Sequence, residues 1–308
     1  MLAKIGYYIF IVPLSYLPMR VIYLFSDILF TLLITVIPYR QKVIIANLKN
    51  SFPEKTDQEL HQIKRKFYRH FCDLLAEAIK NLCISKRELS KRFTVKNSEI
   101  MDALFQQGKS VILVSGHYNN WEWMITSQNF LFPHQAMGIG MPLSSKFWDT
   151  KINERRQRFG MKVVNAATLK KSLENQKHEP IALLTLADQS PGDSKKSYWM
   201  NFLNQQTAVL FGTELLAHQH DFAVVFFITR KQKRGFYETT LSLITETPST
   251  MEWGTITEKH VQLLEKEIIQ SPHYWIWSHK RWKRKIPENL NKLIAKQRQQ
   301  FDERFGIK

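Results

Sequence analysis

Apolar residues follow two different patterns along the chain. Residues 5–19 and 21–37 are almost wholly apolar, whereas residues 56–82 place their apolar positions at the spacing of one amphipathic helix. Thr56 and Glu59 have the spacing of a capping box at the start of that helix. The pattern therefore predicts an apolar, helical N-terminal segment, followed by a long scaffold helix.

Farther along, short apolar runs alternate with helical segments. The expected strands cover 110–116, 136–141, 161–164, 180–187 and 223–229, and the expected helices between them cover 119–130, 145–159, 167–176 and 208–219. Such an alternation is typical of an α/β fold with a mostly parallel sheet covered by helices on both faces. The alternating run 237–244 predicts a more exposed, antiparallel edge strand.

The apolar beginning is not a simple membrane-spanning helix. Pro13 and Pro18 interrupt its first segment, and Ser26 and Asp27 lie within the second. An Asp at the centre of a spanning helix costs about 2.5–3.5 kcal/mol. Three interpretations stay open: two helices lying in the membrane interface, one marginal span, or a helical cap on the body. Flanking tyrosines and basic residues favour a membrane-associating segment.

These patterns suggest two parts. Residues 1–40 are the expected membrane-anchoring helices, and residues 41–308 are the expected single α/β domain. Within that domain, 41–95 form a helical lead-in and 286–308 a polar C-terminal helix. No internal repeat or Gly/Ser-rich linker divides it.

Composition narrows the function. The 308 residues include 44 Lys and Arg against 27 Asp and Glu, a formal net charge of +17, which favours a polyanionic partner: nucleic acid, an anionic membrane surface or an acidic small substrate. A hydrophobic content of 44% excludes a disordered chain. Two cysteines and the lack of a metal-ligand spacing indicate neither a disulfide scaffold nor a metal site. We expect no metal and no cofactor.

The segment SVILVSGHYNNWEW carries the most informative chemistry. His117 and Glu122 form an H-x4-E motif directly after an apolar strand, where catalytic groups of α/β proteins gather. Within one continuous helix the two side chains would diverge. Because Gly116 ends the strand and an Asn can cap the next helix, His117 can fold back against Glu122.

The spacing alone has little specificity. A second H-x4-E, formed by His260 and Glu265, lies inside an expected continuous helix, and we interpret it as background. Position at the end of a strand is what distinguishes the first copy.

Five blocks in the chain resemble, in the same order, the late (secondary) lipid A acyltransferases of the lysophospholipid acyltransferase superfamily. These enzymes add lauroyl- or myristoyl-type secondary chains to Kdo-bearing lipid A precursors. The blocks are YRQKVIIANLKNSFPEKT (39–56), GHYNNWEW (116–123), INERRQRFG (152–160), LTLADQSPG with FLNQQTAVLFGTELLA (184–192 and 202–217), and WIWSHKRWKRK (275–285). The resemblance covers most of residues 1–285.

The resemblance implies a membrane-associated O-acyltransferase at the cytoplasmic face of the inner membrane. It would move a fatty acyl chain from an acyl carrier protein thioester to a hydroxyl of a lipid A precursor. A hydroxyl is a poor nucleophile until a base removes its proton, and an imidazole with a pKa of about 6.5 suits that step. We expect His117 to be the general base, and Glu122 to hold the other ring nitrogen and stabilise the imidazolium.

Further site residues follow from the resemblance. Arginines on a helix are ordinarily a solvated face, but the block 152–160 implies that one of them binds the substrate's phosphate, with Arg158 favoured and Arg156 second. A loop Asp ordinarily caps a turn. Asp188 and Gln189, however, end the strand 180–187 at the carboxyl edge of the sheet, and we expect them to bind substrate.

Two alternatives compete with this function. The acceptor could be another membrane lipid, of the glycerol, aminoacyl or glycosyl class. More remotely, the chain could be a basic nucleic-acid-binding protein, since the Trp- and Lys/Arg-rich segment 275–285 suits either a membrane interface or RNA stacking. That alternative leaves both motifs at the sheet edge unexplained, so we expect no nucleic acid partner.

Overall fold

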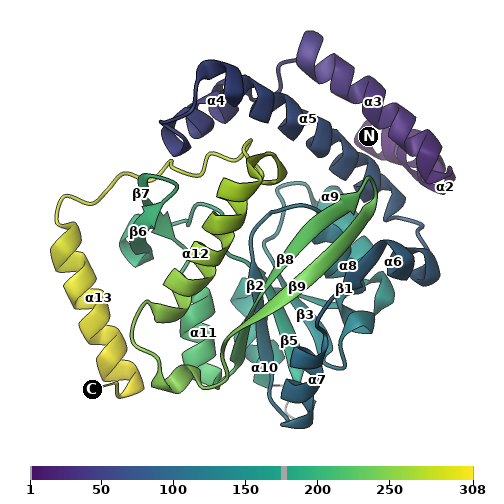
Figure 1. Ribbon diagram of the computed structural model, residues 1–308. Helices are drawn as coiled ribbons and strands as arrows, with labels where there is room; N and C mark the ends of the chain where they lie inside the picture. The colour runs from purple at the N-terminus through teal and green to yellow at the C-terminus, as the bar shows by residue number, and fades with distance from the viewer. Residues whose placement is uncertain (1, 175–178, 308) are drawn as a thin grey trace.

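A seven-stranded sheet forms the centre of the computed structural model, which describes residues 2–174 and 179–307 (Figure 1). Its strand order is β1-β9-β8-β2-β5-β3-β4. Neighbouring strands run parallel, except that β8 and β9 are antiparallel. The strands are β1 (Phe93–Val95), β2 (Val111–Ser115), β3 (Gln135–Gly140), β4 (Lys162–Asn165), β5 (Ile181–Leu186), β8 (Ala223–Lys233) and β9 (Phe236–Thr245).

Alternate residues of the central strands enter two separate cores. Ile112 and Val114 of β2 face one core, and Val111 and Leu113 face the other. The first core is covered by α4 (Gln41–Ser51), α5 (Asp57–Lys80), α10 (Leu169–Glu174), α11 (Gly212–His220) and α12 (Thr255–Gln270). The second is covered by α3 (Met19–Thr35), α6 (Lys86–Arg92), α7 (Glu99–Gln106) and α8 (Trp121–Leu131). The predicted α/β fold, with helices on both faces, is confirmed.

Several details differ from the sequence-based expectation. β9 is antiparallel to β8 as predicted, but it is not an edge strand, because the short β1 pairs with its outer side. The expected helix over 208–219 starts only at Gly212, since residues 205–209 form β7 (Gln205–Val209) in a hairpin with β6 (Tyr198–Phe202). The predicted helix 167–176 ends at Glu174 as described, and its last two positions lie outside the described residues.

The apolar beginning is a broken helical hairpin. It consists of α1 (Leu2–Gly6), a π-helical turn (Tyr7–Ile11), α2 (Val12–Tyr16) and α3. Leu17, which precedes Pro18, is extended and separates α2 from α3, as expected of a residue before proline. Among the described residues, no helix combines the length and the apolar composition that crossing a bilayer requires.

The polar residues of α3 face the protein body. The hydroxyl of Ser26 donates a hydrogen bond of 2.9 Å to the buried carboxylate of Asp73 on α5. Arg234, in the turn between β8 and β9, binds both Asp27 and Asp73. These contacts explain two polar positions within an apolar helix: they attach α3 along α5 and leave its opposite side exposed (Figure 1).

The scaffold helix α5 begins with the predicted capping box of Thr56 and Glu59 and carries a buried carboxylate near its other end. Glu77 accepts hydrogen bonds from the hydroxyls of Tyr23 on α3 (2.6 Å) and Tyr237 on β9 (2.8 Å), and from the amide of Asn120 (2.6 Å). Burial raises the pKa of Glu77 to about 7, against the opposing effect of the tyrosine hydrogen bonds. Glu77 thus joins the N-terminal hairpin to the start of α8.

The C-terminal part closes the structure on the side of α12. The segment 275–285 crosses beside the carboxyl ends of the strands, and α13 (Leu290–Phe305) follows it as the predicted polar helix (Figure 1). Trp275 and Trp277 are buried in the core at 2% and 0% exposure. The segment 275–285 was open to two interpretations, a membrane interface or RNA stacking, and neither applies to these two buried tryptophans.

Candidate active site

The pairing of β2 with β5 brings two loops of the chain together. Ser115 is in register with Leu186, and the amide of Ala187 extends the pairing by donating to the carbonyl of Ser115 at 2.9 Å. Both strands therefore end at the same place. Gly116 allows the close approach there, because a Cβ atom at this position would lie 3.0 Å from Asp188 Cγ and 2.6 Å from Leu264 Cδ2.

His117 and Asp188 form a hydrogen-bonded pair at this strand edge. The imidazole Nδ1 lies 2.6 Å from Asp188 Oδ1, and the backbone amide of His117 donates to Oδ2 at 2.8 Å. Trp275 Nε1 also donates to Oδ2 at 2.8 Å. The carboxylate of Asp188 is 1% exposed, whereas the side chain of His117 is 18% exposed. The acid is thus buried, and the base reaches the surface.

The electrostatics of the pair favour a charged Asp188. Burial by itself would raise the pKa of this carboxyl group, but the charge of His117 and the three hydrogen bonds outweigh it and hold the pKa at about 2. A carboxylate at Nδ1 requires the ring proton to be there, which leaves the lone pair on Nε2.

Two side chains lie beside the rest of the His117 ring. Gln189 Nε2 lies 3.2 Å from His117 Nε2 and can donate to its lone pair. The ring of Trp121 stands edge-on to the imidazole, with the ring centroids 5.1 Å apart. An imidazole with a carboxylate behind it and an available Nε2 can remove a proton from a hydroxyl group. The structure thus brings together three of the sequence-predicted residues, His117, Asp188 and Gln189.

The expected hydrogen bond between Glu122 and His117 is wrong. Asn120 caps α8, its side-chain oxygen accepting from the amide of Trp123 at 3.0 Å, and Glu122 then points towards α9 (Lys146–Arg156). There its carboxylate binds the guanidinium groups of Arg155, at 2.6 Å, and Arg156. Burial would raise the pKa of Glu122, but the two arginines hold it at about 2. Asp188 takes the position at Nδ1 that was expected for Glu122.

The predicted phosphate-binding arginines have partners within the protein. Arg158 donates to the carbonyls of Asn81 (2.6 Å) and Ile84 (3.0 Å), where it satisfies the end of α5. Arg156 is engaged with Glu122. Both Arg156 and Arg158 bind groups within the protein. Their binding of substrate phosphate stays a prediction, and this geometry does not support it.

Trp275 is a site residue that sequence reasoning missed. Its segment suggested a membrane interface or RNA stacking, but its indole binds Asp188, and Tyr118 pairs with it through an isolated antiparallel bridge. The turn carrying His117 is further held by Asn119, which adopts a left-handed conformation (φ 51°) and donates from its backbone to the carbonyl of Tyr274. Trp275 and Asp188 are 87 positions apart, and nothing in the sequence indicates that they are in contact.

An apolar pocket opens next to the pair. It lies between α5 and the start of α8 and holds about 440 Å³ of empty space, its open mouth included. Trp121, which contacts the ring of His117, lines it together with Glu122. The remaining lining is largely aliphatic and aromatic, from Phe71, Leu74, Leu75, Ala78 and Ile276. The pocket therefore offers apolar surface within reach of the candidate base.

Two comparisons with known proteins show what the chain is similar to. The family model described as bacterial lipid A biosynthesis acyltransferase matches residues 3–284. A curated relative, the lipid A biosynthesis lauroyltransferase of Escherichia coli (strain K12), is 22% identical over 275 residues, which cover 89% of each chain. Both the family and this relative are described as acyltransferases. The chain belongs to the bacterial lipid A biosynthesis acyltransferase family.

Proposed function

We propose that this chain is a membrane-associated O-acyltransferase, which moves a fatty acyl group from an acyl carrier protein thioester to a hydroxyl of a lipid A precursor. The observation that carries the proposal is the His117–Asp188 pair at the carboxyl edge of the sheet. Family membership supports the acyltransferase chemistry and favours the enzyme over the nucleic-acid-binding alternative. Asp188 replaces Glu122 as the group that orients the base.

The transfer needs one base and no acyl-enzyme. His117 Nε2 takes the proton of the acceptor hydroxyl as the oxygen attacks the thioester carbon, and Asp188 stabilises the imidazolium that forms. The tetrahedral intermediate then collapses, the new ester bond remains, and the carbon–sulfur bond breaks. The departing thiolate takes the proton from the imidazolium, which returns His117 to its starting state.

The pocket between α5 and α8 suits the hydrocarbon part of a substrate. Its aliphatic and aromatic lining, which includes Phe71 and Ile276, can remove an acyl chain from water. The gain is about 0.8 kcal/mol per buried CH₂ group. Trp121 links this lining to His117. An acyl chain in the pocket would have its thioester end near the base.

The N-terminal hairpin suits the surface of a membrane. Large apolar side chains are exposed along it, among them Tyr8, Ile9, Phe10, Tyr16, Val21, Leu24, Phe25, Ile28, Leu32, Val36 and Ile37. So many exposed large apolar side chains on one short segment are unusual on a protein that meets only water. Because the polar side of α3 binds α5, the geometry favours helices lying in the interface. We place the protein at the cytoplasmic face of the inner membrane.

The experiment is mass spectrometry of the products formed from a panel of acyl donors and lipid acceptors. Purified wild type is compared with His117→Ala on acyl carrier protein and coenzyme A thioesters, each offered with lipid A precursors and with glycerol-, aminoacyl- and glycolipids. We expect an added ester-linked chain on the lipid A precursor, with the acyl carrier protein donor preferred. His117→Ala should lose at least about 10²-fold in rate.

The outcomes separate the alternatives. Acylation of another lipid class alone would keep the chemistry and move the acceptor to that class. Full activity in His117→Ala would remove the mechanism.

A further inference from the structure

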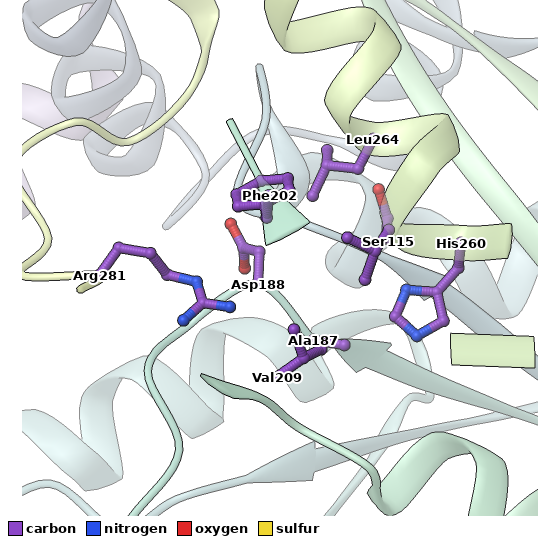
Figure 2. A pocket seen from close by; sticks show the side chains of 9 residues that line it. Ser115, Ala187, Asp188, Phe202, Val209, His260, Leu264 and Arg281 are labelled. Atoms are coloured by element: carbon purple, nitrogen blue, oxygen red, sulfur yellow. The ribbon is translucent and has the colours of Figure 1, made fainter. Parts of the chain in front are cut away.

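A small cavity lies beside Asp188 (Figure 2). It is lined by residues at the ends of β2, β5, β6 and β7, on α12 and in the segment 275–285. Its polar walls are Ser115, Asp188, His260 and Arg281, and its apolar walls are Ala187, Phe202, Val209, Val261 and Leu264. The space open to the centre of a water molecule is about 10 Å³, which is close to the minimum for one ordered water.

Arg281 is a buried cation at this cavity. The residue is 3% exposed, and its Nη1 donates to the carbonyl of Ala208 at 2.7 Å. Figure 2 shows its guanidinium group turned towards Asp188. Its Nε has no hydrogen-bond partner among the described residues. Burying a charged group with an unpaired donor costs free energy. A carboxylate on the other side of the cavity reduces that cost, because it attracts the guanidinium charge.

The charge of Arg281 persists at neutral pH. Burial lowers the pKa of its guanidinium to about 10, and the carboxylate of Asp188 opposes that effect. No direct ion pair joins the two residues within the described part of the chain. The cavity therefore separates a permanent cation from the carboxylate that holds His117.

His260 forms the third polar wall. It is 2% exposed, and its Nε2 also lacks a partner within residues 2–174 and 179–307. Burial lowers its pKa to about 4, so the ring is neutral at pH 7. An ordered water in the cavity would have the polar groups of Arg281, His260 and Asp188 around it (Figure 2).

We propose that Arg281 is a positioning residue of the acyl-transfer site, which holds Asp188 as an oriented carboxylate through one ordered water shared with His260. This inference rests on the proposed function. The second H-x4-E motif thereby gains a role for its histidine, although Glu265 turns away to bind the backbone amide of Leu203. Arg281 acts on His117 only through Asp188.

The cation also sets how strongly His117 holds a proton. While His117 is neutral, Arg281 balances the buried carboxylate. Once the imidazolium forms, the same positive charge opposes it and favours proton release to the leaving thiolate. The other titratable groups that face the pair are His260 on α12 and His279 in the segment 275–285, whose pKa burial also lowers.

The test is the pH dependence of kcat in full-length Arg281→Met, which removes the charge and retains an apolar stem. We expect kcat to fall at least about tenfold with KM nearly unchanged. The acidic limb of the profile should move to higher pH by about half a unit or more, because His117 then protonates more easily. Arg281→Lys, which keeps a charge, should leave the limb in place.

Two controls make the result specific. Lys280→Met removes an exposed positive charge at the preceding position and should not move the limb. In an Asp188→Asn background, Arg281→Met should have little further effect, because the residue through which it acts is gone. If Arg281→Met does not fold, Arg281→Gln, which can still donate to the carbonyl of Ala208, takes its place.

A fall in rate with an unmoved limb, or equal effects in the wild-type and Asp188→Asn backgrounds, would overturn the inference and leave Arg281 a packing residue. Failure of the proposed function is a different result, because the wild type itself would then transfer no acyl chain in the same assay.

Discussion

Asp188 Oδ1 accepts a hydrogen bond from His117 Nδ1 across 2.6 Å, although the two residues are 71 positions apart in the chain. The parallel register of β2 and β5 produces this contact, and Trp275 fixes the carboxylate from a third segment. Three distant parts of the sequence are thus needed to present one imidazole. The arrangement makes Asp188 the partner on which the base depends.

Asp188→Asn should reduce kcat by about 10²–10⁴-fold, because an amide cannot stabilise the imidazolium and can hold the ring in the wrong tautomer. Steady-state rates with a thioester donor and a lipid acceptor measure the effect. Asp193→Asn is the matched control: it lies on the same loop, and its carboxylate caps a backbone amide there. Retention of more than a third of the wild-type rate in Asp188→Asn would contradict the assignment of the pair.

Glu122→Gln should act mainly on stability. It leaves the half-buried guanidinium groups of Arg155 and Arg156 without their carboxylate, and we expect a loss of about 3 kcal/mol in the free energy of unfolding. Denaturant unfolding of the detergent-solubilised protein measures it. Glu154→Gln, which breaks the exposed ion pair with Lys151, should change the same quantity by no more than about 1 kcal/mol.

The same variant also tests the geometry at the site. Because Glu122 does not contact His117 in the structure, the pH profile of the remaining activity should keep its acidic limb. A displaced acidic limb in Glu122→Gln would show that Glu122 acts on the imidazole after all.

The contribution of Glu77 to stability should fall as the pH rises from about 5 to 7, whereas buried histidines with a lowered pKa, such as His260, contribute in the opposite direction. Burial raises the pKa of Glu77 from 4.5 to about 7, so the folded state binds more protons than the unfolded state within that window. The stabilisation is complete below pH 4.5 and is lost as the pH rises through 7, at up to about 1.4 kcal/mol per pH unit for one proton. Glu214, whose pKa burial also raises to about 7, contributes in the same direction.

Unfolding of Glu77→Gln between pH 5 and 8 isolates its share. The difference in free energy of unfolding between wild type and Glu77→Gln should shrink as the pH rises from 5 to 7, and the difference for Glu214→Gln should shrink in the same way. A wild-type slope that persists in Glu77→Gln at full size would refute the assignment to Glu77.

The exposed face of the N-terminal hairpin should bind membranes. Replacing Phe10, Leu24 and Val36 together with serine removes large apolar side chains that are each at least half exposed, so the fold should be retained. Full burial of such a side chain contributes about 1.5–3 kcal/mol, and we expect at least about a tenfold loss of affinity. Cosedimentation with vesicles of phosphatidylethanolamine and phosphatidylglycerol measures it.

The control for membrane binding is Leu243→Ser with Ile269→Ser, two exposed apolar positions outside the hairpin. This double variant should sediment with the vesicles as the wild type does. Equal losses in both variants would assign the binding to general surface hydrophobicity rather than to the hairpin.

Local patterns in the sequence predicted most of the fold and part of the site. Apolar runs located the main strands, and the capping box located the start of α5, because both depend on neighbouring residues. The β6–β7 hairpin was missed. Its turn residues, Leu203 and Asn204, both have positive φ values without a glycine to indicate it.

The partner of His117 could not be predicted, for a physical reason. The edge at which β2 and β5 both end follows from strand order, which individual strands do not encode. Glu122 was five residues away and chemically suitable, but the N-cap at Asn120 sets the direction of α8 and turns its carboxylate towards α9. Asp188 and Gln189 were assigned to the correct edge, with substrate rather than His117 as their expected partner.

The hydrogen bonds of Glu77 have a practical consequence for any truncation that removes the apolar N-terminal hairpin. A shortened protein that starts after α3 would lack Tyr23, Ser26 and Asp27, and would uncover Glu77 and Asp73 on the flank of α5. Asn120, which depends on Glu77, begins the helix next to the imidazole. Removing the hairpin to gain solubility would therefore disturb the helix beside His117 and lower activity. The loss would occur even in an assay that uses detergent-dispersed lipid and needs no bilayer.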